Sequence, residues 1–290
     1  MKSVPECMPC SLRQILNTSR SAGADDAARR EMVIRASELA KEMDFTQSPA
    51  HNSTMALKIV PAATGCPDPY EREKSEYNRA ALALLPEIRA RVEASSDRML
   101  SAALTAVAGN VIDLGITGGA EIDVAGSLDT VFREGFAVNH LDRLKRALAA
   151  PCRVMYLADN AGEIVFDIPL MAELSRAGHD VTFAVHGGPV LNDALIADAR
   201  ETGIDRMFRV ISTGSDWVGL EWGTCDEGFR QAFRAAAVVI AKGQGNYETI
   251  EGLELAPVET YFLLKAKCRP VAKSLGIGFG QAALKRKGTD

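Results

Sequence analysis

The chain has 290 residues, of which 47% are hydrophobic, and a formal net charge of -5 at pH 7, so it can bury a sizeable core. The negative charge and the interspersed basic residues argue against a nucleic-acid groove, and the longest nearly uncharged run, from Met99 to Ile112, is too short to cross a membrane. Because the start lacks an apolar signal core, we expect a cytoplasmic protein with reduced cysteines and with neither nucleic-acid nor membrane partners.

The first 150 residues predict helices almost throughout. The segment from Asp25 to Met43 carries apolar residues at helical spacing, with acidic residues at its front. The segment from Tyr70 to Ala94 is a second long helical pattern, and Pro86 is expected to kink or divide it. We therefore predict an all-helical subdomain over residues 1–150, with an approximate boundary.

After Pro151 the pattern changes to short β-prone runs separated by helical segments. The runs are Val154 to Leu157, Val181 to Val185, Phe208 to Ile211, Val238 to Ile240 and Tyr261 to Leu264. This alternation predicts an α/β domain over residues 151–290, with a mainly parallel sheet covered by helices on both faces. The basic run from Lys285 to Lys287 is interpreted as a solvated tail.

Acidic and amide side chains follow the first two predicted strands, where ligands bind in sheets of this kind. Asp159, Asn160 and Glu163 come after the first strand, and the Asn192-Asp193 pair comes after the second. Hard divalent cations prefer such oxygen ligands. Because His186 is the only histidine at a predicted strand end, oxygen ligands fit better than a zinc site made of histidines. Helix capping is the alternative at both strand ends.

Hydroxyl groups, glycines and a lysine follow the later strands. The stretch from Ser212 to Gly219 is suited either to a sugar or phosphate oxygen or to a surface turn. Lys242, Gly243 and Asn246 follow the fourth strand, and a lysine beside a flexible backbone suits a phosphate. Neither the phosphate-loop spacing nor Gly-x-Gly-x-x-Gly is present. One edge of the sheet thus carries acidic residues that can bind a cation and a lysine that can bind an anion. This combination favours phosphoryl transfer to water.

Several strings of the chain also occur, in the same order, in one known family. They are Cys7-Met8-Pro9-Cys10, Asp68-Pro69-Tyr70 with Lys74 and Asn78, Gly109 to Asp113, Asp159 to Glu163, Asn192-Asp193 and Lys242 to Glu248. Together they resemble the metal-dependent damage-control phosphatase family, long catalogued as domain of unknown function eighty-nine. The paired cysteines resemble its mainly prokaryotic branch, and the resemblance covers almost the whole chain.

The resemblance implies an all-helical N-terminal subdomain on a three-layer α/β/α domain. It also implies one divalent metal ion bound by Asp159, Asn160 and Asp193. Lys242 matches a lysine of the site, and Lys267 stands where the family places another basic residue. Some relatives carry Arg-Thr-x-Lys where this chain has Leu264-Lys265-Ala266-Lys267.

We therefore predict a metal-dependent phosphomonoesterase that hydrolyses small phosphorylated metabolites, either sugar phosphates or damaged phospho-metabolites, with manganese, cobalt, nickel or magnesium. The predicted catalytic residues are Asp159, Asp193 and Lys242. The predicted substrate-binding residues are Asn110, Asp113, Gly162, Glu163, Lys242, Gly243, Asn246 and Lys267. Whether water or a carboxylate attacks phosphorus is left open, as is the oligomeric state.

The pair Cys7 and Cys10 has three interpretations. It is a packing feature at the start of a helix, an accessory metal site completed by other cysteines, or a redox pair, although a redox pair of the thioredoxin kind needs a preceding strand. Cys225 is expected to be buried rather than reactive.

Two other functions fit parts of the pattern. One is a non-catalytic module that binds a metal and a sugar phosphate or nucleotide, which would bind ligand without releasing phosphate. The other is a methyltransferase, which would bind its cofactor without added metal.

Overall fold

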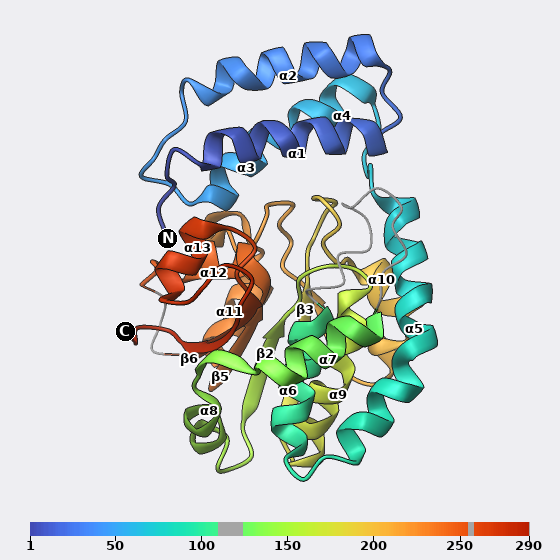
Figure 1. Cartoon of the computed structure of the whole chain (residues 1–290), viewed down its shortest axis with the longest axis vertical. Helices are drawn as coiled ribbons and strands as arrows, with labels where there is room; N and C mark the ends of the chain where they lie inside the picture. Colours follow the sequence, from blue (N-terminus) through green and yellow to red (C-terminus); the bar gives the residue numbers. More distant parts are fainter. Residues whose placement is uncertain (110–123, 255–257, 290) are drawn as a thin grey trace.

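Figure 1 shows the computed structural model of the chain, which describes residues 1–109, 124–254 and 258–289. Among these residues, no helix is both long and apolar enough to cross a bilayer. The predicted fold class is confirmed, since N-terminal helices precede a mostly parallel seven-stranded sheet with helices on both faces. The division at residue 150 stays a prediction.

The N-terminal helices form a layer above the rest of the molecule (Figure 1). They are α1 (Cys7–Ser21), α2 (Asp26–Ala40), α3 (Pro49–Leu57) and α4 (Ile59–Thr64). The side chain of Asp25 accepts a hydrogen bond from the N–H of Ala28 and so caps α2, and Ser48 caps α3 in the same way. Ile15 and Met32 lie in the small apolar core that these helices enclose.

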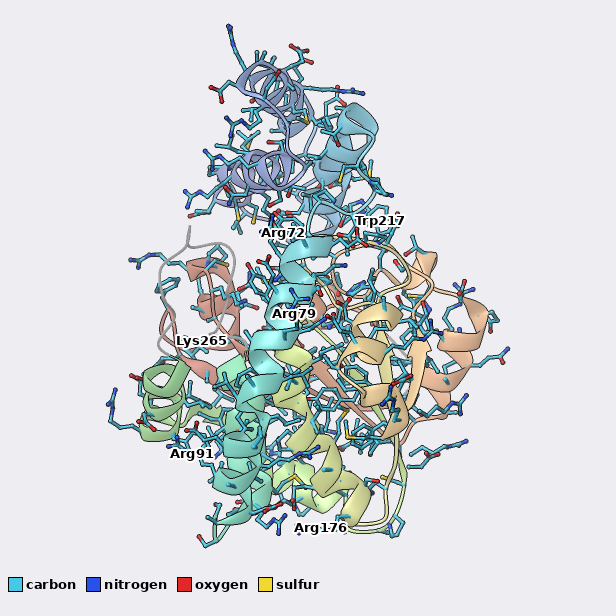
Figure 2. All side chains as sticks on the ribbon, turned by 90° about the vertical axis from the view of Figure 1, so that its right-hand side faces the viewer. Arg72, Arg79, Arg91, Arg176, Trp217 and Lys265 are labelled. Carbon is cyan, nitrogen blue, oxygen red and sulfur yellow. The ribbon has the colours of Figure 1, made fainter. Side chains whose placement is uncertain are left out.

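A long helix, α5 (Glu71–Glu93), joins this layer to the α/β part, and Figure 2 shows Arg72, Arg79 and Arg91 along its length. Pro86 lies inside α5 and does not divide it, because a proline removes only one hydrogen bond from a helix that is packed on one side. The next helices are α6 (Arg98–Gly109), α7 (Val124–Glu134) and α8 (Leu141–Ala147).

The sheet has the strand order β1-β7-β6-β5-β2-β3-β4. The strands are β1 (Phe136–Asn139), β2 (Arg153–Leu157), β3 (Asp180–Val185), β4 (Arg209–Ser212), β5 (Val238–Lys242), β6 (Glu259–Lys265) and β7 (Ala282–Arg286). Strands β2 to β6 run parallel, whereas β7 is antiparallel to β6 and β1 is parallel to β7. From β2 the chain adds β3 and β4 on one side and then β5 and β6 on the other, so the topological switch point lies between β2 and β5.

The two strands at one end of the sheet, β1 and β7, were not predicted. Strand β1 lies before residue 150, and β7 contains Lys285 and Arg286 of the basic run that was interpreted as a solvated tail. That interpretation is wrong: Lys285 is buried, and Arg286 forms an ion pair of 2.9 Å with Glu259 on β6. Strand pairing and a partner carboxylate hold this basic segment in the sheet.

Apolar side chains alternate between the two faces of the sheet. On one face, Tyr156 and Ile240 pack with α6 and α9 (Glu163–Arg176). On the other face, Met155 and Val239 pack with α11 (Glu227–Ala235), α12 (Gly243–Ile250) and α13 (Arg269–Leu275). Helix α10 (Ile196–Glu201) follows β3 and lies near α5.

Candidate active site

Two loops meet beyond the carboxyl ends of β2 and β3. The N–H of Ala161 donates to the carbonyl of Asn192 at 2.9 Å, and the N–H of Ala194 donates to the carbonyl of Asp159 at 2.9 Å. Asn160 and Asp193 form an isolated antiparallel bridge between these bonds. The predicted metal ligands Asp159, Asn160 and Asp193 are therefore brought together by backbone pairing.

The end of β5 closes the same site from the other side of β2. Gly243 has a φ of 77°, and a Cβ atom there would lie 1.9 Å from Oδ2 of Asp159, so only glycine fits. The side-chain amide of Asn246 donates to the carbonyls of Ala158 at 3.0 Å and Lys242 at 2.8 Å. Asn246 was predicted to bind substrate. In the structure, both hydrogen bonds from its side-chain amide connect the ends of β2 and β5.

A cavity of about 220 Å³ lies between these loops and the N-terminal helices. Its lining joins the predicted metal ligands to side chains from α1, α3, α12 and the segment before α13. They include Asp159, Asn160, Asp193, Cys7, Cys10, Ala50, Ser53, Gln244, Glu248, Lys267 and Cys268. The helical layer therefore forms one wall of the site.

The acidic side of the cavity is crowded with carboxyl groups. The amide NH₂ of Asn160 donates to Asp159 at 3.1 Å and to Glu163 at 3.2 Å, which leaves its amide oxygen for other ligands. Oδ2 of Asp193 lies 3.1 Å from Nε2 of His186. Burial, followed by the charges of Glu163 and Asp193, raises the pKa of Asp159 well above its usual value, and Lys267 and Lys242 oppose this rise. The site is therefore short of positive charge.

Lys242 lies behind this site rather than in the cavity wall. Its ammonium is fully buried and donates to Glu163 and Asp167, at 2.6 Å each. Burial lowers the pKa of Lys242, but Asp167 and Glu163 together outweigh it and raise the pKa above its usual value. Tyr156 donates to Asp167 at 2.7 Å, and burial raises the pKa of Asp167 to about 6. Lys242 therefore holds Glu163 in place, and it does not line the cavity, so its predicted contact with phosphate stays a prediction.

Lys267 is the lysine on the cavity side. The residue is exposed and lines the cavity, and its charge lowers the pKa of Asp159. Its backbone N–H donates to the side-chain oxygen of Gln244 at 3.1 Å, which fixes the segment beside α12. An anion in the cavity would meet this ammonium.

The donor set fits a hard divalent cation. Asp159, Asn160 and Asp193 offer two carboxylates and an amide oxygen, the ligand types that magnesium and manganese prefer. Among the residues that the structure describes, no three His, Cys, Asp or Glu side chains are grouped as they would be around a metal ion. A cation here would therefore complete its shell with water and substrate oxygens, as magnesium usually does.

The remaining predicted residues have varied positions. The N–H of Gly162 donates to Asn78, and Glu163 is held between Lys242 and Asn160. Gly162 and Glu163 do not line the cavity. Asn110 and Asp113 lie outside the described residues.

The two cysteines of Cys7-x-x-Cys10 line the cavity, and both thiols have their pKa raised, chiefly by burial. Cys268 and Glu248 lie in the same wall; burial raises the pKa of Cys268 to about 11 and that of Glu248 to about 7. A raised pKa makes the free thiols less reactive, and the three interpretations of the Cys7 and Cys10 pair stay predictions. Cys225 is buried, as expected.

Sequence reasoning missed Gln244, Glu248 and Cys268 as cavity residues. Gln244 and Glu248 are spaced by four residues on α12 and joined by a hydrogen bond of 2.9 Å. This helical spacing directly after a strand end is the signal that points both toward the sheet edge.

Comparisons with known proteins agree with one another. A family model described as "Damage-control phosphatase ARMT1-like domain" matches residues 3–282. A protein of Archaeoglobus fulgidus named "Damage-control phosphatase" is 31% identical over 290 residues, covering 98% of this chain and 99% of that protein. An uncharacterized protein of Methanocaldococcus jannaschii is 32% identical, covering 99% and 96%. The crystal structure of a DUF89 family protein from Pyrococcus horikoshii superposes with a TM-score of 0.89 and 28% identity, over 99% of both chains.

Proposed function

Because this chain belongs to the damage-control phosphatase ARMT1-like domain family, we propose that it is a metal-dependent phosphomonoesterase acting on small phosphorylated metabolites. The observation that carries the proposal is the meeting of opposite charges in the lining of one cavity. Asp159, Asn160 and Asp193 offer oxygen ligands there, and Lys267 lines the same cavity and acts on the charge of Asp159. A phosphate ester bridges such a pair, since its oxygens bind a cation and accept hydrogen bonds from an ammonium.

The chain's own residues would prepare this site in three ways. A divalent ion held by Asp159, Asn160 and Asp193 supplies positive charge to the phosphoryl oxygens when it is bound. Lys267 binds and orients the phosphate. Glu163, fixed by Lys242, accepts from the amide NH₂ of Asn160 and so turns the amide oxygen of Asn160 toward the ion.

The cavity also supports a small substrate. Its volume is about 220 Å³, and the walls from α1 and α3 close it on the side away from the sheet. A site enclosed in this way suits a small metabolite better than a phosphorylated protein surface. Manganese, magnesium, cobalt and nickel are the metals to compare, because the oxygen ligands accept all four.

Phosphate release from chelator-treated protein tests the proposal. The protein is supplied in turn with each of the four metals and assayed with p-nitrophenyl phosphate and a panel of sugar and cofactor phosphates. We expect metal to restore turnover in the wild type, and Asp159→Asn and Asp193→Asn to lower kcat/KM by roughly a hundredfold or more.

Asp216→Asn is the matched control, because Asp216 is an exposed acid beyond the end of β4 that does not line the cavity. Full metal-dependent turnover in Asp159→Asn would sink the assignment of the site. Ligand binding without phosphate release under any metal would instead favour a non-catalytic binding module.

A further inference from the structure

A buried asparagine of α5 contacts the first loop of the site from behind. The N–H of Gly162 donates to Oδ1 of Asn78 at 2.7 Å, and Asn78 is fully buried. Gly162 has a φ of 74°, and a Cβ atom there would lie 2.8 Å from Cβ of Tyr77. The loop that carries Asp159 and Asn160 therefore packs directly on α5.

The orientation of the Asn78 amide is fixed by its other partners. Its NH₂ donates to Asp198 at 2.9 Å and to Glu201 at 2.8 Å, and both partners are carboxylates that only accept when ionised. Turning the amide over would set its NH₂ against the N–H of Gly162 and its oxygen against two carboxylates. The Asn78 side chain thus accepts from the N–H of Gly162 and donates to the carboxylates of Asp198 and Glu201.

The same network reaches the second loop of the site. The second oxygen of Asp198 accepts from the N–H of Leu195 at 2.8 Å, just after the loop that carries Asp193. Lys74, also buried, lies 3.9 Å from Asp198 and 2.5 Å from Asp68. Both loops that hold the proposed metal ligands are therefore tied to α5 through Asn78 and Asp198.

We propose that Asn78 is a positioning residue that sets the separation of Asp159 and Asn160 from Asp193, and hence the affinity of the site for a divalent cation. It does so from outside the cavity, because Asn78 does not line it. The inference rests on the proposed function, since it takes these three residues as metal ligands. Outer partners of metal ligands typically change affinity by 10–100-fold when they are replaced.

The test replaces Asn78 by its nearly isosteric acid. In Asn78→Asp, one oxygen still accepts from Gly162, but the other cannot donate to both Asp198 and Glu201: it has no proton when ionised and only one when protonated. Calorimetric titration of Mn²⁺ into the chelator-treated protein is expected to show binding roughly tenfold weaker than in the wild type. The double variant Asn78→Asp/Asp198→Asn restores a donor between the two side chains and is expected to bind Mn²⁺ within about threefold of the wild type.

Ser75→Ala is the matched control. Ser75 lies on α5 and donates to Glu201 at 2.6 Å, so it belongs to the same network without touching Gly162. We expect this variant to bind Mn²⁺ as the wild type does. Unchanged Mn²⁺ affinity in Asn78→Asp, or no recovery in the double variant, overturns the positioning role.

Amide hydrogen exchange separates this inference from the function on which it rests. The N–H groups of Gly162, Ala161 and Ala194 are expected to exchange faster in Asn78→Asp than in the wild type or in Ser75→Ala, with no metal present. A wild type that binds no Mn²⁺ contradicts the proposed function, whereas unchanged exchange at these amides contradicts the role of Asn78.

Discussion

Lys242 and Lys267 both act on the charge of Asp159 but have different surroundings. Lys242 is fully buried between Glu163 and Asp167, whereas Lys267 is exposed at the cavity. A buried ammonium between two carboxylates stabilises the fold only while all three remain together. Lys267 lines the cavity and is therefore the lysine that can approach a ligand there.

Replacing each lysine should therefore have a different effect. Lys242→Met leaves two buried carboxylates without a counter-charge and should lower the free energy of unfolding by about 3–5 kcal/mol, measured by denaturant titration. Lys267→Met should leave stability almost unchanged and lower kcat/KM by about tenfold or more. Lys265→Met, on β6 and outside the cavity wall, is the control. Equal losses of stability from Lys242→Met and Lys267→Met would contradict this division.

Gly243 is the residue at which a single methyl group should block the site. Gly243→Ala places its Cβ against the carboxylate of Asp159 and forces a positive φ on a residue with a side chain. We expect kcat/KM to fall by about tenfold or more and the free energy of unfolding to fall by about 1–2 kcal/mol. In Gly223→Ala, where nothing lies within 4 Å, both quantities should stay at wild-type values. Normal turnover in Gly243→Ala would argue against Asp159 as a site residue.

At the scale of elements, the helical layer meets the α/β part through α3 and the loop after β4. Nδ1 of His51 lies 3.0 Å from Glu221, and the N–H of Val218 donates to Thr54 at 3.1 Å. The ammonium of Lys58 lies 4.5 Å from the ring centroid of Trp217, which Figure 2 shows just below the helical layer. Because residues of α3 also line the cavity, we expect this contact to affect how firmly the cavity is closed.

Trp217→Ala should loosen that contact and leave the chemistry intact. Loss of the cation–π pair is expected to raise KM by roughly threefold or more while kcat stays close to the wild-type value. Met55→Ala, at an exposed position on α3, is the control for effects on the helix itself. A fall in kcat with an unchanged KM would mean that Trp217 acts on the reaction rather than on closure.

At the scale of the whole molecule, the parallel strands and their shared edge could be predicted from the sequence. Apolar runs in the sequence predicted strands β2 to β6. Asp159 and Asp193 lie close together because β2 and β3 are parallel neighbours whose carboxyl ends lie at the same edge of the sheet. The switch point could not be predicted, because strand order is set by packing between distant segments. The contribution of α1 and α3 to the cavity wall depends on the same long-range packing.

Lys242 shows why a side chain's direction was missed. The predicted strand ended at Ile240, but β5 extends to Lys242. Since side chains alternate along a strand, Lys242 shares the face of Val238 and Ile240, which is the face that α9 covers. Its side chain therefore points to Glu163 and Asp167 of α9 rather than beyond the sheet edge.

The buried acids predict how the stability of the whole chain depends on pH. Burial raises the pKa of Glu248 from 4.5 to about 7, with Gln244 opposing the rise, so the folded state holds a proton that the unfolded state releases. Stability should therefore fall as pH rises from about 4.5 to about 7 and level off above that range. Asp167, with a pKa near 6, acts in the same direction.

Glu248→Gln removes the titrating carboxyl group of Glu248 and leaves that of Asp167. The variant should gain stability relative to the wild type as pH rises, by on the order of 2–3 kcal/mol at pH 8. Denaturant titrations at pH 5, 6, 7 and 8 measure this difference. Parallel curves for the two proteins across that range would contradict the assignment of the proton to Glu248.

The most direct test of the central claim is the position of a bound metal ion. Crystals grown with Mn²⁺ and inorganic phosphate should give an anomalous manganese peak within about 2.4 Å of oxygens from Asp159, Asn160 and Asp193. The phosphate should lie between that ion and the ammonium of Lys267. A manganese peak elsewhere, such as among Cys7, Cys10 and Cys268, or no peak from protein that binds Mn²⁺ in solution, would contradict the proposed site.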